Sequence, residues 1–133
     1  MHKDKALAHI KKDLASEEEL IGFFQAQGAF RLWLFFIIGP LALLSLRQYF
    51  VAVTNKGIHF HLLNILGKFS QHDFFSYDEI KKIEIGKGML QIPIKFFFEN
   101  KKLKIKAQKK GFERVATVDE KTLDYIKNNV KSA

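Results

Sequence analysis

The sequence predicts an α+β fold built mostly from antiparallel strands, with a helix near each end. The stretch Tyr49–Phe60 (YFVAVTNKGIHF) places two apolar, β-branched and aromatic segments around Asn-Lys-Gly, which is typical of a β-hairpin. Lys102–Gln108 alternates polar with apolar residues, the period of a strand that has one wet face. Near both ends of the chain the apolar residues recur instead at helical spacing.

The first element is a short amphipathic helix over Asp4–Ala15, because Leu7, Ile10 and Leu14 recur at i, i+3 and i+7 among lysines. Residues 16–19 (Ser-Glu-Glu-Glu) have the spacing of a capping box and could open another helical turn. We favour a charged, solvated corner before a strand at Leu20–Gln25, because that segment shows no helical stripe.

Leu32–Leu46 contains no charged residue and is broken by Gly39-Pro40. As a helix it would reach only about 22 Å, short of the roughly 30 Å of a bilayer core. We favour burial, as a strand and short helix in the core or in an oligomer interface, over shallow membrane contact and over a true span. Several of its side chains should then be exposed on the monomer or covered by another subunit. The possible interaction surface consists of Trp33, Phe35, Phe36, Leu41 and Leu44.

After Leu32–Leu46 the sequence predicts a series of β-hairpins. Lys102, Lys104 and Lys106 should point outward, with Leu103 and Ile105 inward. Pro93 cannot donate to a strand ladder, so a bulge or a sheet edge is expected there. The predicted strands are Gln48–Thr54, Ile58–Ile65, Phe69–Ser76, Ile80–Ile85, Leu90–Glu99 and Lys102–Gln108.

The end of the chain returns to helical periodicity. Thr117-Val-Asp-Glu120 has capping-box spacing, and Leu123, Ile126 and Val130 follow at i, i+3 and i+7, so these three should pack against the strands. We expect one domain over residues 1–133, in which 1–18 form an N-terminal helical extension and 117–131 the C-terminal helix.

Two segments carry a resemblance to a known family. YFVAVTNKGIHF at Tyr49–Phe60 and SYDEIKKIEIGKG at Ser76–Gly88 resemble bacterial pleckstrin-homology-like (PH-like) domains. The short helix before the strand start Glu-Glu-Glu-Leu-Ile (17–21) resembles the YokE-like branch. The resemblance implies a PH-like antiparallel barrel, or orthogonal sheets, closed by a C-terminal helix. In lipid-binding relatives, basic residues of the first loop bind inositol phosphates. Here that region is apolar between Arg31 and Arg47, so phosphoinositide recognition does not carry over.

The amino-acid composition limits the classes of function that this protein could have. The formal charge is +8, and six lysines fall within Lys101–Lys110 without an acid among them. Lys95, Lys102, Lys104 and Lys106 form a possible basic patch, although alternating lysines also suit an ordinary solvated strand face. Cysteine is absent, which excludes disulfides and thiolate chemistry and fits a cytoplasmic protein. The acidic residues and serines fall into no catalytic pattern, so we expect no enzyme and no cofactor.

The histidines are the remaining candidates for chemistry. His59 and His61 share one strand face, and His72 falls on the neighbouring strand, so three imidazoles could hold zinc or copper. Because spacing alone does not show that they converge, we interpret them as half-exposed histidines and predict no metal site.

The sequence thus favours a non-enzymatic binding or assembly module that acts through a protein partner or through homo-oligomerisation. The alternative is a peripheral domain bound to anionic lipid at the inner face of the membrane. Nucleic-acid binding ranks third, because the lysine strand lacks interleaved aromatic residues.

Overall fold

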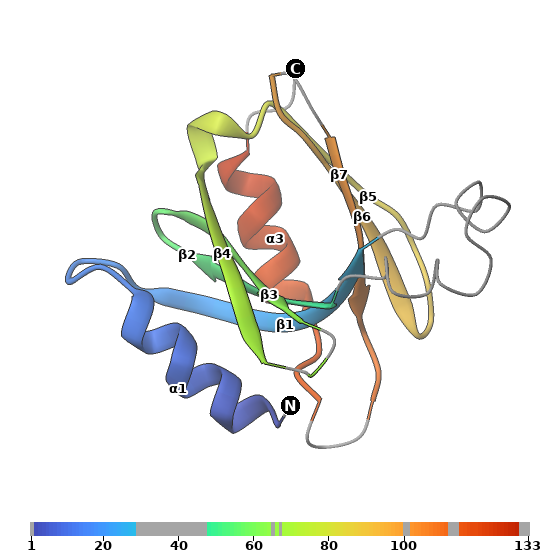
Figure 1. Cartoon of the computed structure of the whole chain (residues 1–133). Helices are drawn as coiled ribbons and strands as arrows, with labels where there is room; N and C mark the ends of the chain where they lie inside the picture. The colour runs from blue at the N-terminus through green and yellow to red at the C-terminus, as the bar shows by residue number, and fades with distance from the viewer. Residues whose placement is uncertain are drawn as a thin grey trace, which may run out of the picture.

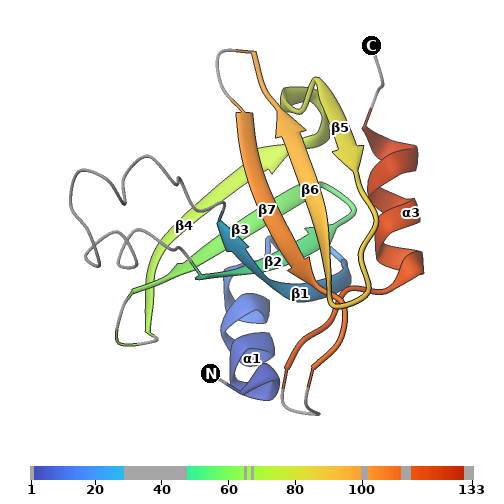
Figure 2. The same ribbon diagram turned by 90° about the vertical axis from the view of Figure 1, so that its right-hand side faces the viewer.

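The computed structural model describes residues 2–28, 48–64, 66, 68–99, 102–111 and 115–130. Its strands form one antiparallel sheet of seven, in the order β4-β3-β2-β1-β7-β6-β5. The sheet bends strongly, so that the β5–β7 end turns over the β2–β4 end (Figures 1 and 2). The strands are β1 (Leu20–Gly28), β2 (Gln48–Thr54), β3 (Gly57–Leu63), β4 (Phe69–Ser76), β5 (Lys82–Ile85), β6 (Gln91–Phe97) and β7 (Lys102–Gln108).

The predicted mostly antiparallel, PH-like architecture is confirmed. A short 3-10 helix, η2 (Tyr77–Glu79), connects the edge strands β4 and β5. Residues 16–19 form the expected corner rather than a helical turn. Of the bulge or sheet edge expected at Pro93, the bulge is wrong: the β6–β7 register runs through Pro93 without a shift, opposite Lys106. The edge holds only locally, because β6 is paired on both sides but the β5–β6 register ends at Ile94, so the missing N–H lies beyond that ladder.

Two helices cover opposite faces of the sheet. α3 (Glu120–Asn129) lies within the bend of the sheet, whereas α1 (Lys3–Asp13) packs outside it (Figure 1). The α3 helix approaches β1 so closely that a Cβ atom on Gly22 would collide with Thr122. Glycine is therefore required at position 22 by this contact rather than by its backbone angles.

The main core lies between the sheet and α3. Leu123, Ile126 and Val130 are buried there, as predicted, and Ile105 is buried while Leu103 is half-buried. The helix begins later than the expected capping box, because Asp119, not Thr117, accepts a hydrogen bond from the backbone N–H of Thr122.

A second, smaller core holds α1 against the outer face of the sheet. Ala6 and Ile10 of α1 pack on Phe50 and Ala52 of β2. Because Val51 and Val53 of β2 belong to the main core, this strand is buried on both faces. The docked α1 therefore brings its last turn next to the outer faces of β3 and β4.

No helix in the described part of the chain is long and apolar enough to cross a membrane. The possible interaction surface of Trp33, Phe35, Phe36, Leu41 and Leu44 lies outside the described residues, as does all of Leu32–Leu46.

Candidate functional site

A group of polar side chains lies where α1 meets the outer face of β3 and β4. Its histidines, His9, His59, His61 and His72, come from α1, β3 and β4, and its carboxylates are Asp13 and Glu18. We call these six residues the histidine pocket. His59 and His61 point to one face because they are two residues apart on β3, and His72 is the direct cross-strand partner of His61. Sheet register and the docked helix therefore assemble the pocket.

A chain of hydrogen bonds runs through one side of the pocket. The Glu18 carboxylate lies 2.6 Å from Nε2 of His59, and Nδ1 of His59 lies 2.7 Å from Nε2 of His72. Glu18 also accepts hydrogen bonds from the Thr54 hydroxyl, at 2.6 Å, and from the backbone N–H of Ala15. Burial raises the pKa of Glu18, but these hydrogen bonds outweigh it, and the pKa falls below its ordinary value. Glu18 is therefore an ionised acceptor at neutral pH.

The other side of the pocket centres on Asp13 and His61. Oδ2 of Asp13 lies 3.4 Å from Nε2 of His9, 3.9 Å from Nδ1 of His61 and 4.0 Å from Nδ1 of His72. The His61 side chain is 1% exposed, and neither of its ring nitrogens has a hydrogen-bond partner among the described residues. A buried polar atom without a hydrogen-bond partner lowers the stability of a fold by about 1–3 kcal/mol, so a histidine that only packed at position 61 would destabilise the protein.

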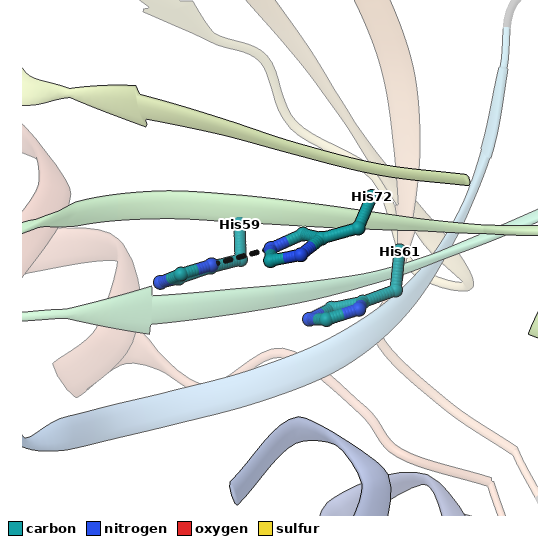
Figure 3. A group of neighbouring side chains, drawn as sticks. All are labelled: His59, His61 and His72. Atoms are coloured by element: carbon teal, nitrogen blue, oxygen red, sulfur yellow. Dashed lines mark hydrogen bonds between the residues drawn. The ribbon is translucent and has the colours of Figure 1, made fainter. Parts of the chain in front are cut away.

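The imidazole rings of His59, His61 and His72 are stacked in nearly parallel planes (Figure 3), whereas the His9 ring meets that of His61 edge-on. The ring centroids of His61 and His72 are 4.3 Å apart, and those of His59 and His72 are 4.9 Å apart. Burial first, and then the neighbouring imidazoles, lower the pKa of His61 to about 4 and lower that of His72. His61 and His72 are therefore neutral at pH 7 and keep lone pairs that can act as ligands.

Two expectations from the sequence are wrong here. His59 and His61 are buried, at 4% and 1% exposed, rather than half-exposed, because α1 covers that face of the sheet. The Glu18 side chain is only 4% exposed and is not part of a fully solvated corner. The convergence of His59, His61 and His72 was considered from their spacing. The part played by His9, Asp13 and Glu18 was missed, and only the i, i+4 spacing of His9 and Asp13 on α1 could have indicated it.

The predicted basic patch is a second polar feature. The outward side of β5, β6 and β7 carries five lysines and one acid, Glu84, and we call it the lysine face. Lys102, Lys104 and Lys106 are exposed, as predicted, and Lys95 is half-buried beside them, opposite Lys104. The fifth is Lys82 on β5, opposite Phe97.

One aromatic ring lies on the lysine face. The ammonium groups of Lys82 and Lys95 lie 5.5 and 6.0 Å from the centre of the Phe97 ring. These are distances at which a cation is attracted to the face of a ring. The lysine face is therefore a strongly basic surface with a single ring available for stacking.

Comparison with known proteins agrees with the architecture. The family model described as "Bacterial PH domain" matches residues 14–129. Among solved structures, the hSac2 domain from the human phosphoinositide phosphatase Sac2 is similar, with a TM-score of 0.57 and 14% sequence identity. The similarity covers 95% of this chain and 76% of that one. At this identity the likeness shows the fold alone. No curated protein matches the chain.

Proposed function

This chain belongs to the bacterial PH domain family, and we propose that it is a non-enzymatic binding module whose lysine face docks on an anionic partner. The YokE-like branch, suggested by the N-terminal segment, stays a prediction. The single observation that carries the proposal is the unequal charge of the lysine face, where five lysines meet one glutamate over three adjacent strands.

The arrangement of this face favours binding by charge. The exposed lysines of β7 lie at alternate positions on a paired strand, so their ammonium groups form a regular row. The Lys82 ammonium lies 3.7 Å from Glu84, which leaves the row on β7 as the least compensated part. Such a row attracts negatively charged surfaces and speeds their association. The first candidate partner is therefore an acidic surface on another protein.

A second candidate, an anionic membrane surface, is favoured by the β5–β6 turn. Met89 and Leu90 in this turn are 77% and 67% exposed. Lys87 lies in the same turn, and Lys109 approaches it from the end of β7, donating its backbone N–H to the Leu90 carbonyl at 2.9 Å. Apolar side chains between lysines suit the boundary of an anionic bilayer, where each lysine near the surface contributes about 1 kcal/mol.

Self-association through the apolar run remains a separate proposal, which rests on the sequence of Leu32–Leu46. Homo-oligomerisation would cover Trp33 and Phe36 without requiring a second gene product. Light scattering of the wild type beside a Trp33→Glu, Phe36→Glu variant tests it. Equal masses for the two proteins would argue against it.

The lysine face is tested by binding the full chain to poly-glutamate and to phosphatidylcholine vesicles with and without phosphatidylserine. Lys102→Ala, Lys104→Ala, Lys106→Ala should weaken binding to both anionic probes at least tenfold. The matched control removes the same charge from the exposed helix positions Lys5, Lys11 and Lys121. Equal losses in the two triple variants would show that net charge alone acts, and would overturn the proposal.

A second variant separates the two candidate partners. Met89→Ser, Leu90→Ser should reduce vesicle binding and leave poly-glutamate binding unchanged if the turn inserts into the bilayer boundary. If vesicle binding is unchanged in this variant, or if vesicles are not bound at all, the membrane candidate fails and the acidic protein partner remains.

A further inference from the structure

We propose that the histidine pocket binds one zinc ion, with His9, Asp13, His61 and His72 as ligands and His59 and Glu18 as positioning residues. This inference does not depend on the lysine face. A zinc ion at this point would join the last turns of α1 to β3 and β4.

The spacing of the ligand atoms supports this set. In a tetrahedral zinc site with ligands at 2.0–2.1 Å, neighbouring ligand atoms lie roughly 3.3 Å apart. The Asp13 carboxylate oxygen lies 3.4, 3.9 and 4.0 Å from single nitrogens of His9, His61 and His72. The ligand atoms of His9, Asp13 and His61 all lie within 4.8 Å of one another. The ligand atoms of His59, His61 and His72 also lie within 4.8 Å of one another, so His61 is common to two such groups. Movement of the imidazoles toward Asp13 would bring the proposed ligands to coordination distance.

His61 supplies an independent reason to expect a ligand. Its side chain is 1% exposed, and its nitrogens have no hydrogen-bond partner in the described part of the chain. Its neighbours on the same sheet face include Phe50 and Phe69, among which an apolar side chain would pack without an unsatisfied nitrogen. A metal bound at Nδ1 would give this buried lone pair a partner.

The Glu18–His59–His72 chain orients the His72 ring. Ionised Glu18 can only accept, so Nε2 of His59 carries the proton that it accepts. Nδ1 of His59 lies 2.7 Å from Nε2 of His72, so this hydrogen bond holds the Nε2 side of the His72 ring. Nδ1 of His72 is then the nitrogen that faces Asp13, at 4.0 Å. Metal-binding histidines typically make such an outer-shell hydrogen bond through their second ring nitrogen.

Rigid elements hold the remaining ligands. His9 and Asp13 are four residues apart and share one face of α1. The His9 ring is stacked on Phe69 at a centroid distance of 3.9 Å, which restrains its rotation. His61 and His72 are paired across adjacent strands. A site supported in this way is more exact than one built on loops.

The donor set selects the class of metal. Three imidazoles and one carboxylate suit zinc and its transition-metal neighbours, whereas calcium and magnesium require oxygen-rich sites. His9, Asp13 and His72 are each 35–39% exposed, so an ion can enter from solvent. Because four protein ligands complete a tetrahedral shell, the zinc would have a structural role and clamp α1 to the sheet.

The test uses the full chain after treatment with a chelator, titrated calorimetrically with zinc chloride. One equivalent should bind, and zinc should raise the melting temperature, since a ligand of the folded state stabilises it. Asp13→Asn and His61→Gln should each weaken zinc binding at least tenfold. The matched controls, Asp78→Asn on η2 and His2→Gln before α1, should leave it unchanged. Magnesium and calcium should give no heat of specific binding.

Three results would overturn the proposal. They are the absence of stoichiometric zinc binding, an affinity unchanged in both ligand variants, and equal losses in the ligand and control variants. If His61→Gln does not fold, Asp13→Asn and His9→Gln decide the outcome, because both positions are partly exposed and tolerate substitution.

Discussion

The histidine pocket and the lysine face are both polar regions on the outer side of the same sheet, but they are built differently. In the pocket, the Glu18 and His59 side chains are 4% and 5% exposed, and their partners lie up to 41 residues apart in sequence. On the lysine face the β7 lysines are exposed, and the alternation of side chains along a strand accounts for their outward orientation. Buried polar groups act as one network, whereas solvated charges act nearly independently. A substitution in the pocket should therefore lower the free energy of unfolding strongly and disturb the other members of the network. A substitution on the lysine face should lower it little, and the effects of several such substitutions should add.

The largest loss of stability is expected from Glu18→Ala in the histidine pocket. The substitution leaves His59 buried without its carboxylate, and breaking a buried pair from one side costs about 3–5 kcal/mol. Urea denaturation measures the loss of unfolding free energy. The exposed neighbour Glu17→Ala is the control and should change stability by less than about 0.5 kcal/mol. Equal effects at the two positions would remove the distinction between pocket and surface.

Leu123→Ala tests the apolar support beneath the lysine face. Leu123 is 3% exposed and belongs to the core that β6 and β7 share with α3, so its truncation should cost about 2–5 kcal/mol. Denaturant titration gives this value, and a loss below about 0.5 kcal/mol would mean that α3 is not docked on the sheet. Zinc affinity should not change in this variant as long as it folds.

Asp119→Ala removes a hydrogen bond between residues close in sequence, whereas Glu18→Ala removes one between residues far apart. The Asp119 carboxylate caps α3 through the Thr122 N–H, and a lost cap costs about 1 kcal/mol, less than Glu18→Ala. Hydrogen bonds from Thr122 lower the pKa of Asp119. A depressed pKa stabilises the fold above the ordinary carboxyl pKa, and this contribution disappears as pH falls through the folded-state value. Unfolding curves of the two proteins should converge in acid. A difference that grows in acid would contradict the assignment.

The smallest effect is expected from Lys104→Ala on the lysine face. Because this lysine is exposed and no described carboxylate forms an ion pair with it, stability should change by less than about 0.5 kcal/mol. Thermal unfolding of the variant at low and high salt should give nearly the wild-type midpoint. A loss above about 1 kcal/mol would show that the lysine face contributes to the fold.

The sequence predicted the lysine face more completely than the histidine pocket. Strand alternation placed Lys102, Lys104 and Lys106 outward, because that period depends only on local backbone geometry. It also placed His59 and His61 on one face. It could not show that α1 covers this face, because the docking of Ala6 and Ile10 on Phe50 is a tertiary contact without a local signal. Glu18 was assigned to solvent for the same reason: its partners Thr54 and His59 lie 36 and 41 residues further along the chain.

The most direct test of the pocket is a long-range ¹H–¹⁵N correlation spectrum of the imidazole groups, recorded without zinc and with one equivalent. Without zinc, Nε2 of His59 should carry a proton, as its hydrogen bond to ionised Glu18 requires. Zinc should then shift Nδ1 of His61 and His72 and Nε2 of His9, and leave the nitrogens of His2 unchanged. A spectrum in which Nε2 of His59 carries no proton, or in which zinc shifts only His2, would contradict this account.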